Sequence, residues 1–563
     1  MDEPERQRKP VLVAVDADAG ALGLIERELT RRYGEDYRVV CADSAEAGLR
    51  TLEGCREAGE EVALALADQW LPGTTGIEFL ARVRRLHPGA RRVLMMAWGA
   101  WADRESTDPI NRATAFGQVD AYVLKPWHSP DEAFHQAVTG FLHEWTWAHP
   151  ARAAEVRVVA EPWSPRSHDL RDLLERSGLS HTFYAPDSPE GRALLAEVGQ
   201  SASRLPVLVL ADGQVLIDPT NLAIAESLGA VRELERRDFD VVVIGAGPAG
   251  LSAAVYGASE GLRTLILERE TIGGQASASS LIRNYLGFLH GISGSQLARE
   301  AYLQALTFGA RFHFMRHATA LRRDGREFVV SLSDGTDVTA RAVVLATGVS
   351  YRRLGVPGLE ALVGTGVFYG AAGAEAPAMA GQEVYVVGGA NSAGQAAMYL
   401  SKYASRVTLV VRHGPLGAEM SDYLVQGIEA TENIAVRLDA EVVDGGGEGR
   451  LEHLVLRDRA TGQTERVPAA GLFVVIGAVP RTEWLPGEIE RDESGYLVAG
   501  RDLLRDGRPP AGWPLDRPPL PLETSLPGVF AAGDVRYRAT KRVASAVGEG
   551  AIAIRLVHEY LGP

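Results

Sequence analysis

The sequence predicts an α/β protein in which helices cover both faces of mainly parallel sheets. Short apolar runs such as VLVAV, VALALA, LPVLVL and VVLATG alternate with helical patterns along the chain, and this βαβα rhythm is typical of parallel sheets. Two further runs, VVVIG and VYVVGG, lead into glycine-rich turns, as strands do in nucleotide-binding units. A chain of 563 residues is long enough for about three to five domains.

The composition is that of an ordinary globular protein, with 46% hydrophobic and 23% charged residues. The net charge of −15 argues against a nucleic-acid surface, which is usually basic. No apolar run reaches the roughly 18 residues of a membrane-spanning helix, and the start MDEPERQRKP has no apolar signal core. We therefore expect a cytoplasmic protein with no nucleic-acid partner and no membrane partner.

The chain contains two cysteines, Cys41 and Cys55. Their spacing fits neither a redox pair nor a zinc site, so we interpret them as ordinary thiols. The sequence predicts no metal site to which ligands can be assigned.

Residues 1–148 are predicted to form the first domain, with charged side chains at the ends of its strands. Asp16 follows VLVAV, Asp68 follows VALALA, and Lys125 precedes a proline after AYVL. The segment resembles a response-regulator receiver domain, which is doubly wound. The resemblance implies that Asp68 is a phospho-acceptor candidate, with Asp16 and Lys125 beside it. Phosphoryl transfer to such an aspartate needs a divalent metal held by carboxylates.

Two departures from the receiver pattern argue against phosphorylation. Ala17 stands where the second acidic residue is usual, although Asp18 follows, and Met96 replaces the usual threonine or serine. A methionine side chain cannot donate a hydrogen bond to a phosphoryl oxygen. We expect a degenerate receiver used for dimerisation or docking, and a phosphorylatable Asp68 is the alternative.

Residues 152–232 are predicted to form the second domain, which resembles a thioredoxin or glutaredoxin. The strand VRVV leads to the turn Trp163-Ser164-Pro165-Arg166-Ser167 and then to a helix. Both cysteines of the family are serines here, and the resemblance makes Pro206 the candidate for a cis peptide bond. We interpret Ser164 as a helix N-cap, and a docking surface for a thiol or a peptide is the alternative.

The first glycine-rich turn is predicted to bind a dinucleotide. A strand runs into Gly245, Gly247 and Gly250, then a helix follows, and a second strand ends in Glu268. Gly245 allows the tight turn, Gly247 lets a pyrophosphate approach the backbone, and Gly250 lets the helix pack on the strand. The helix N-terminus faces the phosphates, and Glu268 can accept from a ribose hydroxyl.

From residue 238 to the C-terminus the chain resembles the low-molecular-weight thioredoxin reductases. The resemblance continues through GGQ (273–275), ATG (346–348), GVFAAGDV (528–535) and KRVASAVGEGAIA (541–553). It implies two nucleotide-binding Rossmann-type domains, with an FAD-binding domain formed by 238–355 and 479–563. It further implies FAD contacts from Pro248, Ala249, Gly274, Gln275, Asn284, Thr347, Gly348, Gly533, Asp534, Arg542 and Val543.

The second glycine-rich turn lies in residues 356–478, which the resemblance assigns to an NAD(P)-binding domain. Its candidate contacts are Gly388, Asn391, Ser392 and Arg412. Ala390 replaces the middle glycine of the family pattern, so its methyl group reduces clearance and would add strain if φ were positive. A single arginine, Arg412, stands in the segment that usually carries a basic cluster for NADPH. Nicotinamide binding therefore stays open, as does the choice between NADPH and NADH.

The stretch FYGAAGAEAP (368–377) aligns with the redox Cys-x-x-Cys of the thioredoxin reductases. Gly370 and Gly373 stand at the two sulfur positions, and neither can form a thiolate or a disulfide. We expect these small residues to open space over the flavin ring for a ligand or an acceptor.

The three modules in this order resemble the fused response regulator/thioredoxin reductase-like flavoproteins. The main hypothesis is an FAD-dependent oxidoreductase that passes electrons from NAD(P)H to a non-disulfide acceptor, either a small molecule or a protein. One alternative is a non-catalytic flavin-binding scaffold, and another is a flavin oxidase that acts directly on a small substrate. The resemblance also suggests a homodimer, and no catalytic acid, base or nucleophile is assigned.

Overall fold

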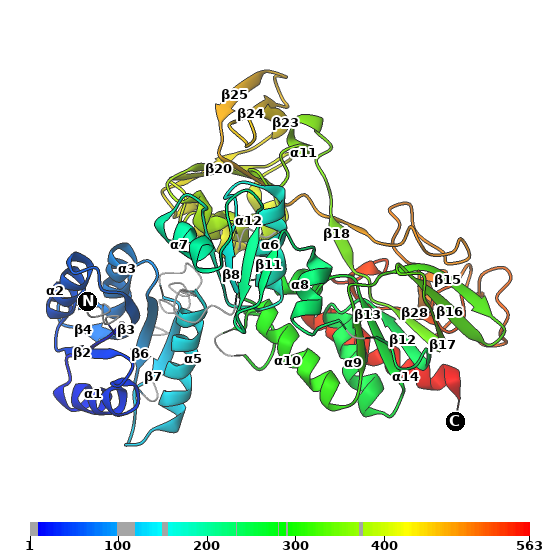
Figure 1. The fold of residues 1–563 in the computed structure, drawn as a ribbon, viewed down its shortest axis with the longest axis horizontal. Helices are drawn as coiled ribbons and strands as arrows, with labels where there is room; N and C mark the ends of the chain where they lie inside the picture. The colour runs from blue at the N-terminus through cyan, green and yellow to red at the C-terminus, as the bar shows by residue number, and fades with distance from the viewer. Residues whose placement is uncertain are drawn as a thin grey trace. The chain divides into compact units, whose positions relative to one another are not determined.

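The computed structural model describes residues 9–97, 119–148, 156–231, 233–279, 281–288, 291–370 and 375–562 (Figure 1). Its contacts divide the chain into two compact units, Met1–Ala153 with Met420–Glu432, and Ala154–Glu419 with Asn433–Pro563. No helix of these described ranges is both long and apolar enough to cross a membrane.

The first unit contains a five-stranded sheet in the order β2-β1-β3-β6-β7. All its strand pairs are parallel, and this order is that of the flavodoxin-like doubly wound sheets. The core residues show that α2 and α3 cover one face, and α1 and α5 cover the other. The bounds are β1 Val11–Val15, α1 Ala19–Tyr33, β2 Arg38–Ala42, α2 Ala45–Glu57, β3 Val62–Asp68, α3 Gly76–Leu86, β6 Arg91–Met96, β7 Ala121–Leu124 and α5 Glu132–Ala148.

The second unit begins with a four-stranded mixed sheet in the order β11-β10-β8-β9. Ser164 caps α6, since its hydroxyl oxygen accepts from the backbone N–H of Ser167 at 3.1 Å. The peptide bond between Leu205 and Pro206 is cis. The predictions for Ser164 and Pro206 are thus confirmed. The bounds are β8 Val156–Val159, α6 Pro165–Arg176, β9 His181–Tyr184, α7 Pro189–Glu197, β10 Val207–Leu210, β11 Val215–Ile217 and α8 Asn221–Ser227.

The largest sheet runs in the order β14-β13-β12-β17-β16-β15, and β28 pairs with β17. Strands β14, β13, β12, β17 and β28 are mutually parallel, whereas β15 and β16 form an antiparallel extension. Helices α9, α10 and α14 share a core with β12 and β17. The bounds are β12 Asp238–Ile244, α9 Pro248–Ser259, β13 Thr264–Glu268, α10 Gly294–Thr307, β14 Arg311–Phe314, β15 Ala318–Asp324, β16 Glu327–Leu332, β17 Asp337–Leu345, β28 Val529–Ala531 and α14 Val543–Leu561.

A second parallel sheet has the order β19-β26-β20-β21-β22, and a three-stranded antiparallel sheet β23-β24-β25 accompanies it. The short ribbon of β18 (Val349–Tyr351) and β27 (Ala478–Pro480) joins this part to the largest sheet. The remaining bounds are α11 Pro357–Glu360, β19 Val367–Tyr369, β20 Glu383–Val387, α12 Asn391–Leu400, β21 Arg406–Val410, α13 Asp422–Glu429, β22 Ile434–Arg437, β23 Ala440–Gly446, β24 His453–Asp458, β25 Thr464–Pro468 and β26 Gly471–Val474.

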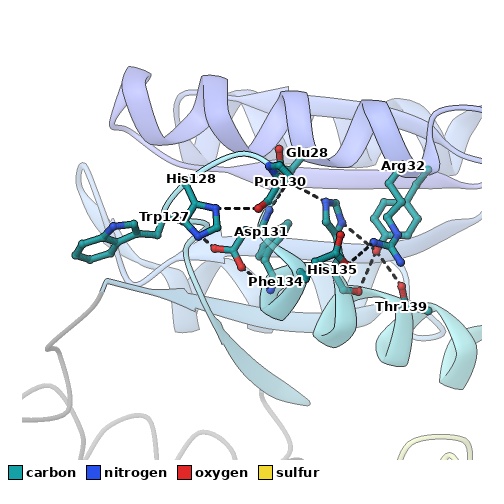
Figure 2. Close-up of polar contacts among 11 residues, drawn as sticks. Glu28, Arg32, Trp127, His128, Pro130, Asp131, Phe134, His135 and Thr139 are labelled. Atoms are coloured by element: carbon teal, nitrogen blue, oxygen red, sulfur yellow. Dashed lines mark hydrogen bonds and ion pairs between the residues drawn. The ribbon is translucent and has the colours of Figure 1, made fainter.

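In the first unit, buried polar contacts tie α5 to α1 (Figure 2). The Glu28 carboxylate accepts from the backbone N–H of Asp131 at 3.0 Å and lies 2.8 Å from Nε2 of His135. The Tyr33 hydroxyl donates to the carbonyl oxygen of His135 at 3.0 Å. These contacts hold the connection between β7 and α5, which begins at Lys125.

A buried ion pair holds the edge of the same sheet. Arg92 on β6 donates to Asp120 just before β7, from Nη2 at 2.6 Å, from Nε at 3.0 Å and from its backbone N–H at 2.9 Å. The Arg92 side chain is only 4% exposed, so loss of its partner would leave a charge in a poorly solvated place.

We expect Asp120→Ala to destabilise the first unit by about 3–5 kcal/mol, because it leaves the buried Arg92 charge uncompensated. The control is Glu144→Ala, which removes the half-exposed Arg91–Glu144 pair at 3.0 Å and should cost less than about 1 kcal/mol. Calorimetric melting of the full chain measures both changes. Equal shifts for the two variants would contradict the assignment.

Candidate functional site

Four parallel strands of the largest sheet end at the same edge, and each is followed by predicted site residues. Ile244 of β12 is in register with Leu267 of β13 and with Leu345 of β17, and Leu345 is in register with Ala531 of β28. The segments after these strands carry the glycine turn, Glu268, the ATG segment and the Gly-Asp segment. Ligands of open α/β sheets bind at the carboxyl ends of the strands, so the fold gathers these four segments at a binding edge.

The geometry of the first glycine turn separates the roles of its three glycines. Gly245 has φ of 107°, and a Cβ there would lie 2.4 Å from the carbonyl oxygen of Ala346. A Cβ at Gly250 would lie 1.8 Å from the carbonyl oxygen of Gly245. A Cβ at Gly247 would meet nothing within 4 Å. The turn is therefore closed by packing at two glycines and open at Gly247, where a phosphate can approach.

Helix α9 begins at this open position. Gly247 is its N-cap and provides no side-chain acceptor, and Pro248 occupies its first turn. The first backbone N–H groups of α9 therefore have no side-chain cap, and such groups attract an anion. This arrangement favours the phosphates of a dinucleotide.

Glu268 is buried at the end of β13 and supports the turn. One carboxylate oxygen accepts from the backbone N–H of Ala246 at 2.7 Å, and the other accepts from that of Glu270 at 3.0 Å. Burial raises the pKa of Glu268, although both backbone donors oppose the rise. Each oxygen can accept a second hydrogen bond, and the contact to a ribose hydroxyl stays a prediction.

Asp534 lies beside the start of α9, in the short η7 helix (Gly533–Val535). Gly533 has φ of 77°, a Cβ on it would lie 3.0 Å from Cβ of Ala249, and its N–H donates to Glu549 at 2.7 Å. Asp534 is half-buried, and this burial raises its pKa while the nearby charge of Lys541 lowers it. Its predicted FAD contact is consistent with this place.

Helix α14 packs closely on α9, because Gly550 has no side chain. A Cβ at Gly550 would lie 2.1 Å from the carbonyl oxygen of Ala249, and the Ser252 hydroxyl donates to the carbonyl oxygen of Val547 at 2.7 Å. The N-cap of α14 is Arg542, which is exposed and provides no side-chain cap, and Val543 follows it.

The other predicted FAD contacts occupy different kinds of position. A Cβ at Gly274 would lie 3.3 Å from Cα of Gly247, so this glycine borders the open turn. The Gln275 amide donates to the carbonyl oxygen of Val349 at 2.8 Å, next to Gly348. Thr347 donates to the carbonyl oxygen of Arg481 at 3.3 Å. Asn284 is exposed, and its flavin contact stays a prediction.

The backbone of the second glycine turn departs less from that of the first than the replacement of a glycine by Ala390 suggests. Ala390 is the N-cap of α12 with φ of −99° and ψ of −178°, close to the −72° and −177° of Gly247 before α9. The condition for backbone strain, a positive φ at Ala390, is therefore not met, because this extended conformation is open to every residue. Asn391 and Ser392 begin α12 and are exposed. At Gly388 a Cβ would lie 2.6 Å from the carbonyl oxygen of Val475.

Sequence reasoning found one arginine next to this turn, and the structure adds two more. Nε of Arg412 lies 3.3 Å from Glu441, to which Arg457 and Arg459 also bind. Arg459 donates to Nδ1 of His413 at 2.7 Å. Three arginines around one glutamate leave a net positive charge at the end of β21. Alignment of the segment around Arg412 could not show this, because Arg457 and Arg459 come from β24 and the turn after it.

At Gly370 the expected open space is filled. Gly370 has φ of 103°, and a Cβ on it would lie 2.2 Å from Cε2 of Tyr351. The expectation of space over the flavin ring is thus wrong at this position, because the Tyr351 ring occupies it. Gly373 lies in 371–374, outside the described residues.

The two cysteines belong to the first unit, and neither is poised to react. Burial raises the pKa of Cys41 to about 12, and it also raises the pKa of Cys55. Because the thiolate is the reactive species, this burial disfavours reaction of both thiols.

The predicted phospho-acceptor residues of the first unit lie together. Nζ of Lys125 lies 2.7 Å from Asp16 and 2.8 Å from Asp68. Asp18 instead caps α1, because its carboxylate accepts from the backbone N–H of Ala21 at 2.8 Å. Burial raises the pKa of Asp68, although Lys125 opposes the rise. No group of three or more metal-ligating side chains occurs among the residues that the structure describes, and Met96 is buried.

Comparisons with known proteins agree with this geometry over residues 239–550, which match the family model of the pyridine nucleotide-disulphide oxidoreductases. The chain is 34% identical to the thioredoxin reductase of Treponema pallidum, over 58% of this chain and 97% of that protein. It is 36% identical to the thioredoxin reductase of Mycolicibacterium smegmatis, over 56% of this chain and 94% of that protein.

Solved structures give the same result. The Lactococcus lactis thioredoxin reductase in its FR conformation matches with a TM-score of 0.51 and 27% identity, over 57% of this chain and 99% of that one. The thioredoxin reductase of T. acidophilum matches with a TM-score of 0.51 and 31% identity, over 58% of this chain and 100% of that one. The predicted FAD dependence and oxidoreductase class are thereby confirmed. The chain belongs to the pyridine nucleotide-disulphide oxidoreductases, a family of FAD-dependent enzymes.

Proposed function

We propose that this protein takes electrons from NADPH and passes them through FAD to an acceptor that is not a disulfide. The observation that carries the proposal is the contrast between two positions in the second unit. The dinucleotide turn at Gly247 is open for phosphates, whereas the site of the expected redox pair holds Gly370 packed against Tyr351. The sequence has no cysteine in residues 239–550. Residues 239–550 thus support flavin binding but contain no thiol for the next step.

FAD, when bound, supplies two-electron transfer between the nicotinamide and the acceptor. The protein contributes binding and orientation. The uncapped N–H groups of α9 would hold its phosphates, Glu268 would accept from a ribose hydroxyl, and Asp534 would bind the ribityl chain. The half-buried start of α14 at Val543 would lie near the ring system.

The basic cluster favours NADPH over NADH. Arg412, Arg459 and His413 lie at the end of β21, where the adenosine ribose of a dinucleotide is bound in such sheets. Charge-assisted bonds from arginine suit a phosphate, and NADPH differs from NADH by one phosphate on this ribose. The negative φ of Ala390 supports binding, since the methyl group there adds no backbone strain.

Anaerobic titration of the FAD-loaded protein tests the proposal. NADPH should bleach the flavin band in stoichiometric amount, and NADH should bind more weakly. Arg459→Ala should weaken NADPH binding about tenfold to a hundredfold, because a hydrogen bond to a charged group contributes about 1.5–3 kcal/mol. Its effect on NADH should be small.

Arg466→Ala is the matched control, because Arg466 is an exposed arginine on the neighbouring β25 that contacts His453. It should leave both nucleotides unaffected. If dithionite bleaches the flavin but neither nucleotide does, the nicotinamide-linked function is wrong. The non-catalytic scaffold and the oxidase that acts directly on a small substrate would then be the remaining functions.

A cysteine introduced at position 370 should not restore disulfide reduction. We expect Gly370→Cys to destabilise the second unit by about 1–3 kcal/mol through overpacking, with additional strain from the positive φ, and to confer no disulfide reductase activity. Denaturant unfolding followed by flavin release measures the loss. Gly417→Cys is the control, because a Cβ there meets nothing within 4 Å.

In a Tyr351→Ala background, Gly370→Cys should cost less stability than it does in the natural chain, because the ring that the new side chain would strike is absent. A Gly370→Cys protein as stable as Gly417→Cys would contradict the packing argument.

We further infer that residues 1–148 form a degenerate receiver-like domain, residues 152–232 a thioredoxin-like domain, and 238–355, 356–478 and 479–563 the parts of the reductase. The doubly wound strand order of the first unit and the grouping of Asp16, Asp68 and Lys125 support the first assignment. The protein is proposed to be a homodimer, and its acceptor is a small molecule or a protein.

The degenerate receiver should not accept a phosphoryl group. Asp18 is engaged as a helix cap, and Lys125 already neutralises Asp68, so the acidic set for a divalent metal is incomplete. Intact mass after treatment with a small phosphodonor and Mg²⁺ should show no adduct. An adduct that maps to Asp68 would restore the alternative of an active receiver.

A further inference from the structure

Helix α6 of the second unit is attached to the part that carries the second glycine turn. At its first turns, Nδ1 of His168 lies 2.7 Å from one oxygen of Glu375, and Arg171 lies 3.6 Å from the other. Glu375 is only 3% exposed, and it follows Gly370 in the chain by five positions. A buried carboxylate that pairs with two side chains of one helix is costly to release.

Close packing supports this ion pair. Gly364 has φ of 83°, and a Cβ on it would lie 2.9 Å from Cα of Pro165. The ring of His168 also lies 5.3 Å from that of Phe368 on β19, measured between centroids. The start of α6 therefore packs against β19 and against the segments before and after β19. This packing leaves no room for a side chain at Gly364.

The other end of α6 is attached to the part that carries the largest sheet. Arg176 lies 3.1 Å from Glu270, and the Ser177 hydroxyl donates to Thr271 at 3.1 Å. Met315, which follows β14, packs against the core of the sheet that carries α6. Helix α6 also contacts η3 (Gly274–Ala278), which borders the open dinucleotide turn.

The connection between the two nucleotide-binding parts is thin. It is the ribbon of β18 and β27, in which three residue pairs join Val349–Tyr351 to Ala478–Pro480. Short connections of this kind act as hinges in proteins that close or rotate their domains. The ribbon alone would allow the two parts to change their orientation, so other contacts must hold them.

We propose that α6 is a strut that holds the two nucleotide-binding parts in one mutual orientation, attached through Glu375 on one side and Glu270 on the other. The serine-substituted thioredoxin-like domain thereby has a mechanical role rather than a redox role. The Ser164 hydroxyl serves the same end, because it accepts from the backbone N–H of Ser167 and so caps the start of the strut; the two serine hydroxyls lie 2.9 Å apart. Release of either end would allow rotation about the ribbon.

Distances between the two nucleotide-binding parts, measured by double electron–electron resonance between spin labels, test whether α6 fixes their orientation. The background carries Cys41→Ala and Cys55→Ala, and spin labels are attached at Arg326→Cys, in the turn after β15, and at Thr464→Cys, on β25. Both label positions are exposed. The FAD-loaded full chain should show one distance population, and Glu375→Gln with Glu270→Gln should add a second population.

Glu197→Gln is the matched control, because it breaks the exposed Arg157–Glu197 pair at 3.1 Å within the thioredoxin-like domain alone, and it should change nothing. If the double glutamine variant does not fold, His168→Asn with Arg171→Gln removes the Glu375 contacts from the helix side. An unchanged distance distribution in a folded, FAD-loaded variant would overturn the proposal. No nicotinamide is added, so the result does not depend on the proposed activity.

Discussion

The close approach of α9 to the largest sheet is the constraint on which the rest of the second unit depends. It requires glycine at positions 245 and 250, because a side chain at either would overlap a backbone carbonyl. The same approach directs the start of α9 to the edge where β12, β13, β17 and β28 end. Glu268 then fixes the turn by accepting from Ala246, and Gly533 brings Asp534 to the same place. The packing of α9 on the largest sheet therefore shapes the turn at which a dinucleotide phosphate would bind.

Under the proposed function, electron transfer at this binding edge proceeds without a thiol. Tyr351 belongs to the ribbon that joins the two nucleotide-binding parts, and its ring fills the place where a side chain at residue 370 would lie. The absence of cysteine there is thus part of a packed arrangement rather than an isolated replacement. In contrast, the second glycine turn keeps an extended N-cap conformation, and a basic cluster lies at the end of β21. These features favour a nucleotide that reduces the flavin and an acceptor that needs no disulfide.

Sequence reasoning identified the features that depend on local spacing. The glycine turn, Glu268 and the cap at Ser164 are of this kind, because strand, turn and helix follow one another along the chain. Features that depend on distant segments were missed. Arg457 and Arg459, from β24 and the turn after it, reach the Glu441 carboxylate beside Arg412, and Tyr351 meets Gly370 only through the ribbon. The conformation of Ala390 also could not be predicted, because a glycine pattern does not state whether φ is positive.

The re-oxidation half-reaction tests most directly the claim that the flavin passes its electrons to an acceptor that is not a disulfide. The FAD-loaded protein is reduced anaerobically with dithionite, excess reductant is removed, and the flavin band is followed after addition of oxidised thioredoxin or of a benzoquinone. The account predicts that the flavin stays reduced with thioredoxin, because no thiol of the second unit can carry the electrons to it, and that a small oxidant restores the band. Rapid re-oxidation by thioredoxin would contradict the account.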